Sequence, residues 1–132
     1  MTPHPGEMSR LTGLPAAEIA AHRQDIALQY ARAWDAVVVL KGMHTVVAAP
    51  DGRCRINPTG NPGLARGGSG DVLSGITLAM LSQGLEPFNA ACAGAYTLGA
   101  SADKAMALLK ERMLMARDVT DAVEQTVNKL FE

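Results

Sequence analysis

The sequence predicts a single α/β domain over residues 1–132. Hydrophobic residues make up 48% of the chain and charged residues 19%, a balance that supports a packed interior and disfavours wholesale disorder. An apolar, β-branched run lies between an amphipathic helical pattern and a glycine-rich stretch, and further helical patterns follow. This alternation is typical of a sheet covered by helices.

Composition also excludes several classes of protein. Twelve basic and thirteen acidic residues give a net charge of −1, without the basic excess that nucleic-acid binding usually requires. No apolar run approaches the roughly 20 residues of a membrane span, and the first ten residues lack the apolar core of a signal peptide, so we expect a cytoplasmic protein. Cys54 and Cys92 fit neither a zinc site nor a disulfide framework, and we interpret both as small apolar residues.

The first long pattern predicts one amphipathic helix, opened by Pro15 and continuing to Trp34. Ile19, Ile26 and Tyr30 recur at helical spacing on its apolar face. The run Ala36–Leu40 then predicts a strand that is buried on both faces, as parallel strands are.

Two further strands are expected at Thr45–Ala49 and Arg53–Asn57, joined as a hairpin by the turn Pro50–Gly52. The sheet should be mostly parallel, and Met1–His4 offers a short extended neighbour for the strand Ala36–Leu40.

The carboxyl-terminal part predicts three helices after a glycine-rich stretch at Asn57–Gly75. Val72–Leu81 is apolar almost all round and should be buried, and Pro87 should open the next helix. The charged cluster Lys110–Arg112 is interpreted as a solvated face. Asp118 can cap the last helix, whose apolar stripe consists of Val119, Ala122, Val123, Thr126, Val127 and Leu130.

The strongest chemical motif is Gly67-Gly68-Ser69-Gly70-Asp71 at the start of a helix. Glycines let backbone N–H groups converge on an anion, and a helix N-terminus adds about half a positive charge, so we expect a phosphate site. Asp71 is a candidate base beside that phosphate. The alternative is that Asp71 only caps the helix. The motif matches neither a Walker A loop nor the dinucleotide-binding pattern G-x-G-x-x-G.

Two weaker motifs complete the set of candidates. Lys41 ends the apolar strand, where α/β sheets bind ligands, but it is equally typical of a solvated lysine. His44 is a weaker candidate still, because a lone histidine in a strand connection is usually only solvent-exposed. The loop Thr2–Glu7 presents His4 and Glu7 on a rigid backbone, but from these residues alone a turn before a short helix containing Met8 to Thr12 is the better explanation.

Four segments together resemble the ADP/ATP-dependent NAD(P)H-hydrate dehydratase family of the ribokinase-like superfamily. They are TPHPGEMSRLTG at residues 2–13, VVVLKGMHTVV at 37–47, NPGLARGGSGDVLSGI at 61–76 and ACAGAYTLGASAD at 91–103. The resemblance runs from Thr2 to about Asp121 and implies the carboxyl-terminal portion of a three-layer ribokinase-like domain. Members carry a longer domain, so the chain is expected to be a truncation, a fragment, or one whose sheet a partner chain completes.

The resemblance implies repair of nicotinamide cofactors, in which the S epimer of NADHX or NADPHX is dehydrated to NADH or NADPH at the expense of ADP or ATP. Asp71 would be the catalytic carboxylate, activating the hydroxyl of the hydrated ring, and His4 with Asp71 would bind that substrate. The residues implied for the adenine nucleotide are Lys41, Gly42, Met43, His44, Thr45, Asn61, Gly67, Gly68, Ser69 and Gly70.

The resemblance further implies Mg²⁺ held by the nucleotide phosphates, and a homo-oligomer, a tetramer in the family. Two other functions remain open at this stage. One is a small-molecule kinase of the same superfamily, acting on a vitamin precursor or a sugar with the same Asp71. The other is a non-catalytic remnant that binds nucleotide or only assembles with other chains.

Overall fold

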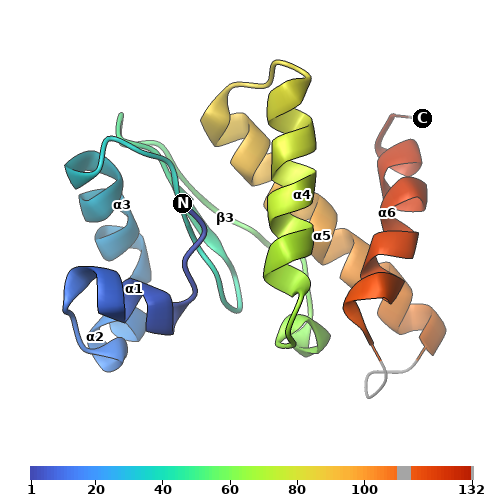
Figure 1. Ribbon diagram of the computed structural model, residues 1–132, viewed down its shortest axis with the longest axis horizontal. Coiled ribbons are helices and arrows are strands. Elements are labelled where there is room, and N and C mark those ends of the chain that lie inside the picture. Colours follow the sequence, from blue (N-terminus) through green and yellow to red (C-terminus); the bar gives the residue numbers. More distant parts are fainter. Residues whose placement is uncertain (110–113, 132) are drawn as a thin grey trace. The chain divides into compact units, whose positions relative to one another are not determined.

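The computed structural model describes residues 1–109 and 114–131, in two compact units, Met1–Asn57 and Pro58–Glu132. Figure 1 shows the helices and strands of both units. The cluster Lys110–Arg112, predicted as a solvated face, lies outside the described residues. None of the described helices is long and apolar enough to cross a membrane.

The first unit places three helices beside a small sheet. Its helices are α1 (Pro5–Thr12), α2 (Ala16–Ala21) and α3 (Arg23–Ala33), and its strands are β1 (Val38–Leu40), β2 (Val46–Ala48) and β3 (Cys54–Ile56). Helix α3 packs against β1 and β2. The buried apolar core of this unit comprises Met8, Ile19, Ile26, Ala27, Ala31, Val38, Leu40, Val46 and Ala48.

The three strands form an antiparallel sheet in the order β1-β2-β3. The hairpin predicted around Pro50–Gly52 is therefore confirmed, with Val47 opposite Arg55. The prediction of a mostly parallel sheet is wrong for these strands. Five residues, 41–45, separate β1 from β2, and a parallel pair needs a crossover of about a dozen residues or more, so this connection can only turn the chain back.

One parallel pairing is present, at the other edge of β1. The Met1 amino group donates to the Val37 carbonyl at 2.7 Å, and the Val39 N–H donates to the Met1 carbonyl at 2.8 Å. The Lys41 N–H continues the ladder by donating to the Pro3 carbonyl at 2.9 Å. The extended neighbour predicted at Met1–His4 is thus confirmed for its first three residues.

The single helix predicted from Pro15 to Trp34 is wrong. The chain leaves helical geometry at His22 (φ −128°, ψ 40°), which separates α2 from α3. The break does not disturb the apolar pattern, because Ile19 and Ile26 are both buried in the same core. Since His22 is neither proline nor glycine, no local residue signal marks the boundary.

The second unit is helical. It contains the short 3₁₀ helix η1 (Pro62–Leu64), α4 (Ser69–Ser82), α5 (Pro87–Leu109) and α6 (Ala116–Phe131). Helix α5 starts at Pro87 as predicted and packs against both α4 and α6 (Figure 1). Small residues allow the close approach, because a side chain at Gly94 of α5 would collide with Thr77 of α4.

Two expectations for these helices are corrected. Helix α4 starts at Ser69, before the predicted Val72, and it is not buried all round: Leu73 is 3% exposed but Leu78 is 66% exposed, because α4 packs on α5 through one face. Asp118 is not the N-cap of α6, which begins at Ala116. Its carboxylate reaches back to the Met115 N–H at 2.7 Å.

The apolar stripe predicted for α6 is confirmed where side chains are described. Val119, Ala122 and Thr126 are buried, and Val123 and Val127 are half-buried. The side chain of Leu130 lies outside the described set. Cys54 and Cys92 are both half-buried, and no disulfide joins them.

Candidate functional site

The glycine-rich turn leads directly into α4. Gly68 occupies the N-cap position with φ +93°, a left-handed conformation that favours glycine, and no side chain caps the helix. A Cβ atom at Gly68 would also lie 3.1 Å from the Cβ of Ala116. The helix therefore begins without a side-chain acceptor at its positive end, as an anion site requires.

Asp71 lies at the third residue of α4, in its first turn. Its backbone N–H donates to the Gly68 carbonyl at 3.1 Å. Its side chain is exposed, and within the described part of the chain no hydrogen bond or ion pair engages the carboxylate. The alternative that Asp71 merely caps the helix therefore receives no support, and the carboxylate stays accessible to a ligand.

Asn61 stands in a second loop of the same unit, where its side chain is already engaged. The Asn61 Oδ1 accepts from the Gly63 N–H at 3.0 Å and caps η1, while Nδ2 donates to Asp103 at 2.9 Å. The second oxygen of Asp103 accepts from the Gly60 N–H at 2.9 Å. Asp103 thus holds this loop from α5. Sequence reasoning missed that role, although Asp103 ends the fourth motif of the resemblance.

His4 and Glu7 form a capping box at the start of α1. The His4 Nδ1 accepts from the Glu7 N–H at 3.1 Å, and the Glu7 carboxylate accepts from the His4 N–H at 2.6 Å. The loop predicted at Thr2–Glu7 is therefore helical from Pro5 onward, which agrees with the alternative of a turn before a helix. Because Nδ1 is an acceptor, the neutral ring carries its proton on Nε2.

Glu7 also connects the Thr2–Glu7 loop to Lys41, the residue that follows β1. Its carboxylate lies 3.5 Å from the Lys41 ammonium and 3.6 Å from His4 Nε2. The hydrogen bond from the His4 backbone N–H, with a further contribution from the nearby Lys41 charge, lowers the pKa of Glu7 below its ordinary value. The Thr2–Glu7 loop and the end of β1, 34 positions apart, thus meet through a carboxylate that sequence analysis named only as part of that loop.

The connection 41–45 between β1 and β2 has an unusual backbone. Gly42 has φ +148° and His44 has φ +56°, both outside the usual range for side-chain-bearing residues. The Thr45 hydroxyl donates to the Gly42 carbonyl at 3.1 Å, and Met43 is 81% exposed. The guanidinium of Arg23 holds this connection from the opposite side, through hydrogen bonds to the carbonyls of Leu40, Lys41 and Met43.

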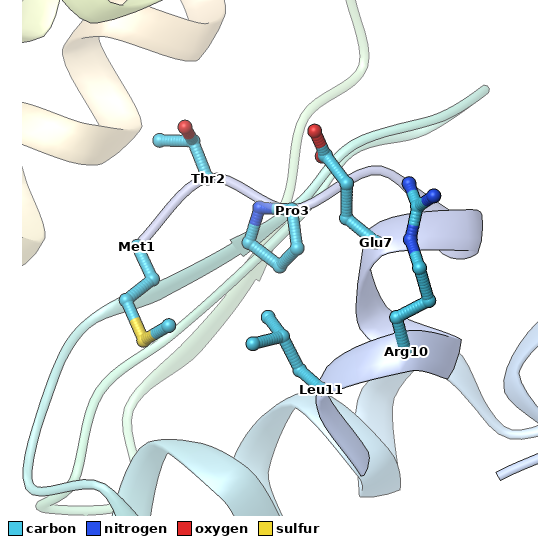
Figure 2. A pocket seen from close by; sticks show the side chains of 6 residues that line it. All are labelled: Met1, Thr2, Pro3, Glu7, Arg10 and Leu11. Atoms are coloured by element: carbon cyan, nitrogen blue, oxygen red, sulfur yellow. The ribbon is translucent and has the colours of Figure 1, made fainter. Parts of the chain in front are cut away.

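A shallow, open pocket of about 380 Å³ lies beside α1. Figure 2 shows the side chains that line the pocket, among them Glu7 and Arg10 of α1. Glu7 thus lines the pocket and also contacts Lys41. The pocket is lined by Met1, Thr2, Pro3, Glu7, Arg10 and Leu11. Three of these residues, Thr2, Pro3 and Glu7, belong to the loop that sequence analysis singled out, and the other three were not assigned to a site.

The structure brings together some of the predicted residues. His4 and Lys41 share Glu7 in the first unit, and Gly67–Asp71 share the start of α4 in the second. In the described residues, no group of three or more histidine, cysteine, aspartate or glutamate side chains could hold a metal ion.

The chain that carries this glycine-rich turn and Asp71 also matches a known protein family. A family model described as NAD(P)H-hydrate dehydratase matches residues 1–126. The chain belongs to the NAD(P)H-hydrate dehydratase family. This confirms the resemblance carried by the four sequence motifs.

Relatives of the dehydratase family cover this chain throughout. A bifunctional NAD(P)H-hydrate repair enzyme from Moorella thermoacetica is 52% identical over 132 residues, which are all of this chain and 25% of that protein. An ADP-dependent (S)-NAD(P)H-hydrate dehydratase from Bacillus subtilis is 42% identical over 132 residues, which are 48% of that protein. The chain therefore spans between a quarter and about half the length of these dehydratases.

Solved structures agree with this assignment. The ADP/ATP-dependent NAD(P)H-hydrate dehydratase from Bacillus subtilis, co-crystallised with ATP and Mg²⁺, matches 97% of this chain and 46% of its own, with 40% identity and a TM-score of 0.93. A ribokinase-like superfamily protein from Enterococcus faecalis matches 96% of this chain and 43% of its own, with 29% identity and a TM-score of 0.72. The chain thus shares its fold with part of a dehydratase structure, and the expected kinship with ribokinase-like proteins is confirmed.

Proposed function

We propose that this chain takes part in the nucleotide-dependent dehydration of the S epimer of NADHX or NADPHX to NADH or NADPH. The observation that carries the proposal is the family match over residues 1–126, combined with an exposed Asp71 at the uncapped start of α4. A kinase acting on a vitamin precursor or a sugar is not favoured, because the named relatives are hydrate dehydratases and hydrate repair enzymes.

Asp71 is the proposed base. Its carboxylate accepts the proton of the hydroxyl on the hydrated ring while that oxygen attacks the terminal phosphorus, and the bond between phosphorus and the rest of the nucleotide breaks. Phosphate then departs with the electron pair of the carbon–oxygen bond, and a proton leaves the neighbouring ring carbon to restore the double bond. The N-terminus of α4 supports the charge on the phosphoryl group, because its first N–H groups have no side-chain cap.

The remaining predicted residues have binding roles in this proposal. His4 offers its Nε2–H to an acceptor atom of the hydrated dinucleotide, since its Nδ1 is engaged by Glu7. For the adenine nucleotide, the proposed binding residues are Lys41, Gly42, Met43, His44, Thr45, Asn61, Gly67, Gly68, Ser69 and Gly70.

Mg²⁺ is the proposed companion of the nucleotide. When bound, it would neutralise phosphate charge. Phosphate oxygens of the nucleotide and water would hold it. A homo-oligomer, a tetramer in the family, and a cytoplasmic location remain proposals that follow from family membership.

The test is recovery of NADH, followed near 340 nm, when the chain is mixed with NADHX, ADP and Mg²⁺. We expect wild-type turnover and its loss in D71N, by at least about a hundredfold because a general base contributes about 10²–10⁴ to the rate. Binding of ADP should be unchanged. The matched control is D121N, an exposed aspartate on α6, with the dehydratase from Bacillus subtilis as positive control.

Two outcomes would contradict the proposal. If a folded D71N variant keeps full turnover, Asp71 is not the base. If the folded wild-type chain recovers no NADH while the positive control does, the chain does not perform the reaction by itself, and family membership then records ancestry alone.

A further inference from the structure

We propose that Arg23 is a positioning residue that holds the Lys41–Thr45 connection in its ligand-binding shape. The inference rests on the proposed function, in which this connection contacts the adenine nucleotide. Arg23 is the first residue of α3, and neither its position in a helix nor its charge identified it from the sequence. Its role follows from contacts that only the folded chain creates.

The guanidinium of Arg23 donates hydrogen bonds to three backbone carbonyls. Its Nη2 donates to the Leu40 carbonyl at 2.9 Å and to the Lys41 carbonyl at 3.3 Å. Its Nη1 donates to the Met43 carbonyl. One side chain thus spans the end of β1 and the turn that follows it, and a planar guanidinium suits this task because its donors point in fixed directions.

The backbone that Arg23 holds is one that needs support. His44 has φ +56°, a left-handed conformation that is disfavoured for a residue with a Cβ atom, and such conformations persist where surrounding contacts over-determine them. Gly42 has φ +148°, and a Cβ there would lie 2.9 Å from Arg23 Nη2. The glycine therefore permits both the turn and the close approach of the guanidinium.

Charge pairing does not explain the location of Arg23. Among the described residues no carboxylate forms an ion pair with it, and its buried Nε has no hydrogen-bond partner. Burial lowers the pKa of Arg23, which remains charged in any case. Burying a cation costs free energy, and the carbonyl partners of Arg23 carry no opposite charge that would offset this cost. The role left for Arg23 is therefore to fix the geometry of the connection.

An ordered connection benefits a ligand directly. A loop that is already in its bound shape does not lose conformational freedom when the ligand arrives, so the affinity is higher. Arg23 acts through Lys41 and its neighbours and needs no contact of its own with the nucleotide. The R23K substitution keeps the positive charge but removes the planar guanidinium, so it separates positioning from electrostatics.

The experiment compares R23K with wild type and with R32K. Arg32 lies on the same helix but is exposed, so R32K is a matched exchange of arginine for lysine. The first readout needs no ligand: NMR order parameters of Gly42, Met43 and His44 should fall from about 0.85 to below about 0.6 in R23K. The second readout is the Kd for ADP with Mg²⁺ by calorimetry, which should rise about tenfold.

The outcomes separate this inference from the proposed function. If the connection in R23K is as ordered as in wild type and R32K, Arg23 does not position it and the inference is overturned. Loss of order in R23K supports the inference. If order is lost while ADP affinity is unchanged, or if wild type binds no ADP, the assignment of this connection to the nucleotide fails and the positioning role stands.

Discussion

At the scale of single residues, Glu7 is the side chain that connects the candidate site of the first unit. Its carboxylate caps α1 through the His4 N–H and lies 3.5 Å from the Lys41 ammonium. The sequence offered Glu7 only as part of a rigid loop, because a contact with Lys41 across 34 positions leaves no local pattern. Asp103, which orients Asn61 from α5, was hidden for the same reason.

The lowered pKa of Glu7 predicts a pH dependence of stability. The folded state binds its proton less tightly than the unfolded state, so the stabilisation from Glu7 is fully present above the ordinary pKa of 4.5 and is lost as the pH falls through the lowered value. Urea unfolding at pH 7 and at pH 3 should therefore show wild type more stable than E7Q at pH 7, with the difference shrinking at pH 3.

The control for this comparison is E18Q, an exposed glutamate in the first turn of α2. An E18Q variant with the same stability profile as E7Q would show that the effect belongs to any glutamate at a helix start. A difference between wild type and E7Q that does not change with pH would show that the carboxylate charge is not its source.

At the scale of elements, the α5–α6 pair shows how a predicted stripe acquires specificity. Thr126 belongs to the apolar stripe of α6, yet its hydroxyl is buried and accepts a hydrogen bond from Ser101 of α5 at 3.1 Å. It also donates to the Ala122 carbonyl at 2.8 Å. Helical spacing predicted that Thr126 faces the core, but the polar partner depends on how the two helices pack.

We predict that T126V destabilises the chain by about 1–3 kcal/mol, because the buried Ser101 hydroxyl loses its acceptor. T120V is the matched control, since Thr120 makes the same kind of bond to the Ala116 carbonyl but is exposed, and its effect should stay within about 0.5 kcal/mol. Chemical denaturation of both variants measures the difference. Equal stabilities for T126V and T120V would contradict a special role for the buried pair.

The sheet shows the limits of element prediction. The turn residues Pro50–Gly52 and the alternation around them predicted the hairpin, which formed. The apolar run before Lys41 predicted a parallel strand with parallel neighbours. The structure places β1 between the parallel segment Met1–Pro3 and the antiparallel β2, so hydrophobicity identified a buried strand but could not tell its direction.

At the scale of the whole molecule, the chain consists of two compact units. It spans about half or less of the length of the relatives reported above. Each unit supplies a different part of the predicted binding residues. His4 and Lys41–Thr45 belong to the first unit, and Asn61 with the start of α4 belongs to the second. Ligand binding is therefore a property to be tested on the full chain.

A ligand that binds only the folded state must raise its stability. If the chain binds ADP with Mg²⁺, free ADP at about a hundred times its Kd should raise the free energy of unfolding by about 2.7 kcal/mol. Thermal denaturation with and without ADP measures this, and the D71N variant should show the same shift because Asp71 is assigned to proton transfer. Absence of a shift in wild type would count against the nucleotide site.

Several local features of this protein follow from residue type and short-range spacing: the hairpin turn, the start of α5 at Pro87, the buried stripe of α6 and the glycine-rich turn before Asp71. The family motifs are local in the same sense. The strand directions, the break at His22 and the contacts of Arg23, Glu7 and Asp103 arise only when the chain packs. Hydrogen bonds and charge contacts between distant segments leave no periodic pattern in the sequence, so they could not be predicted from it.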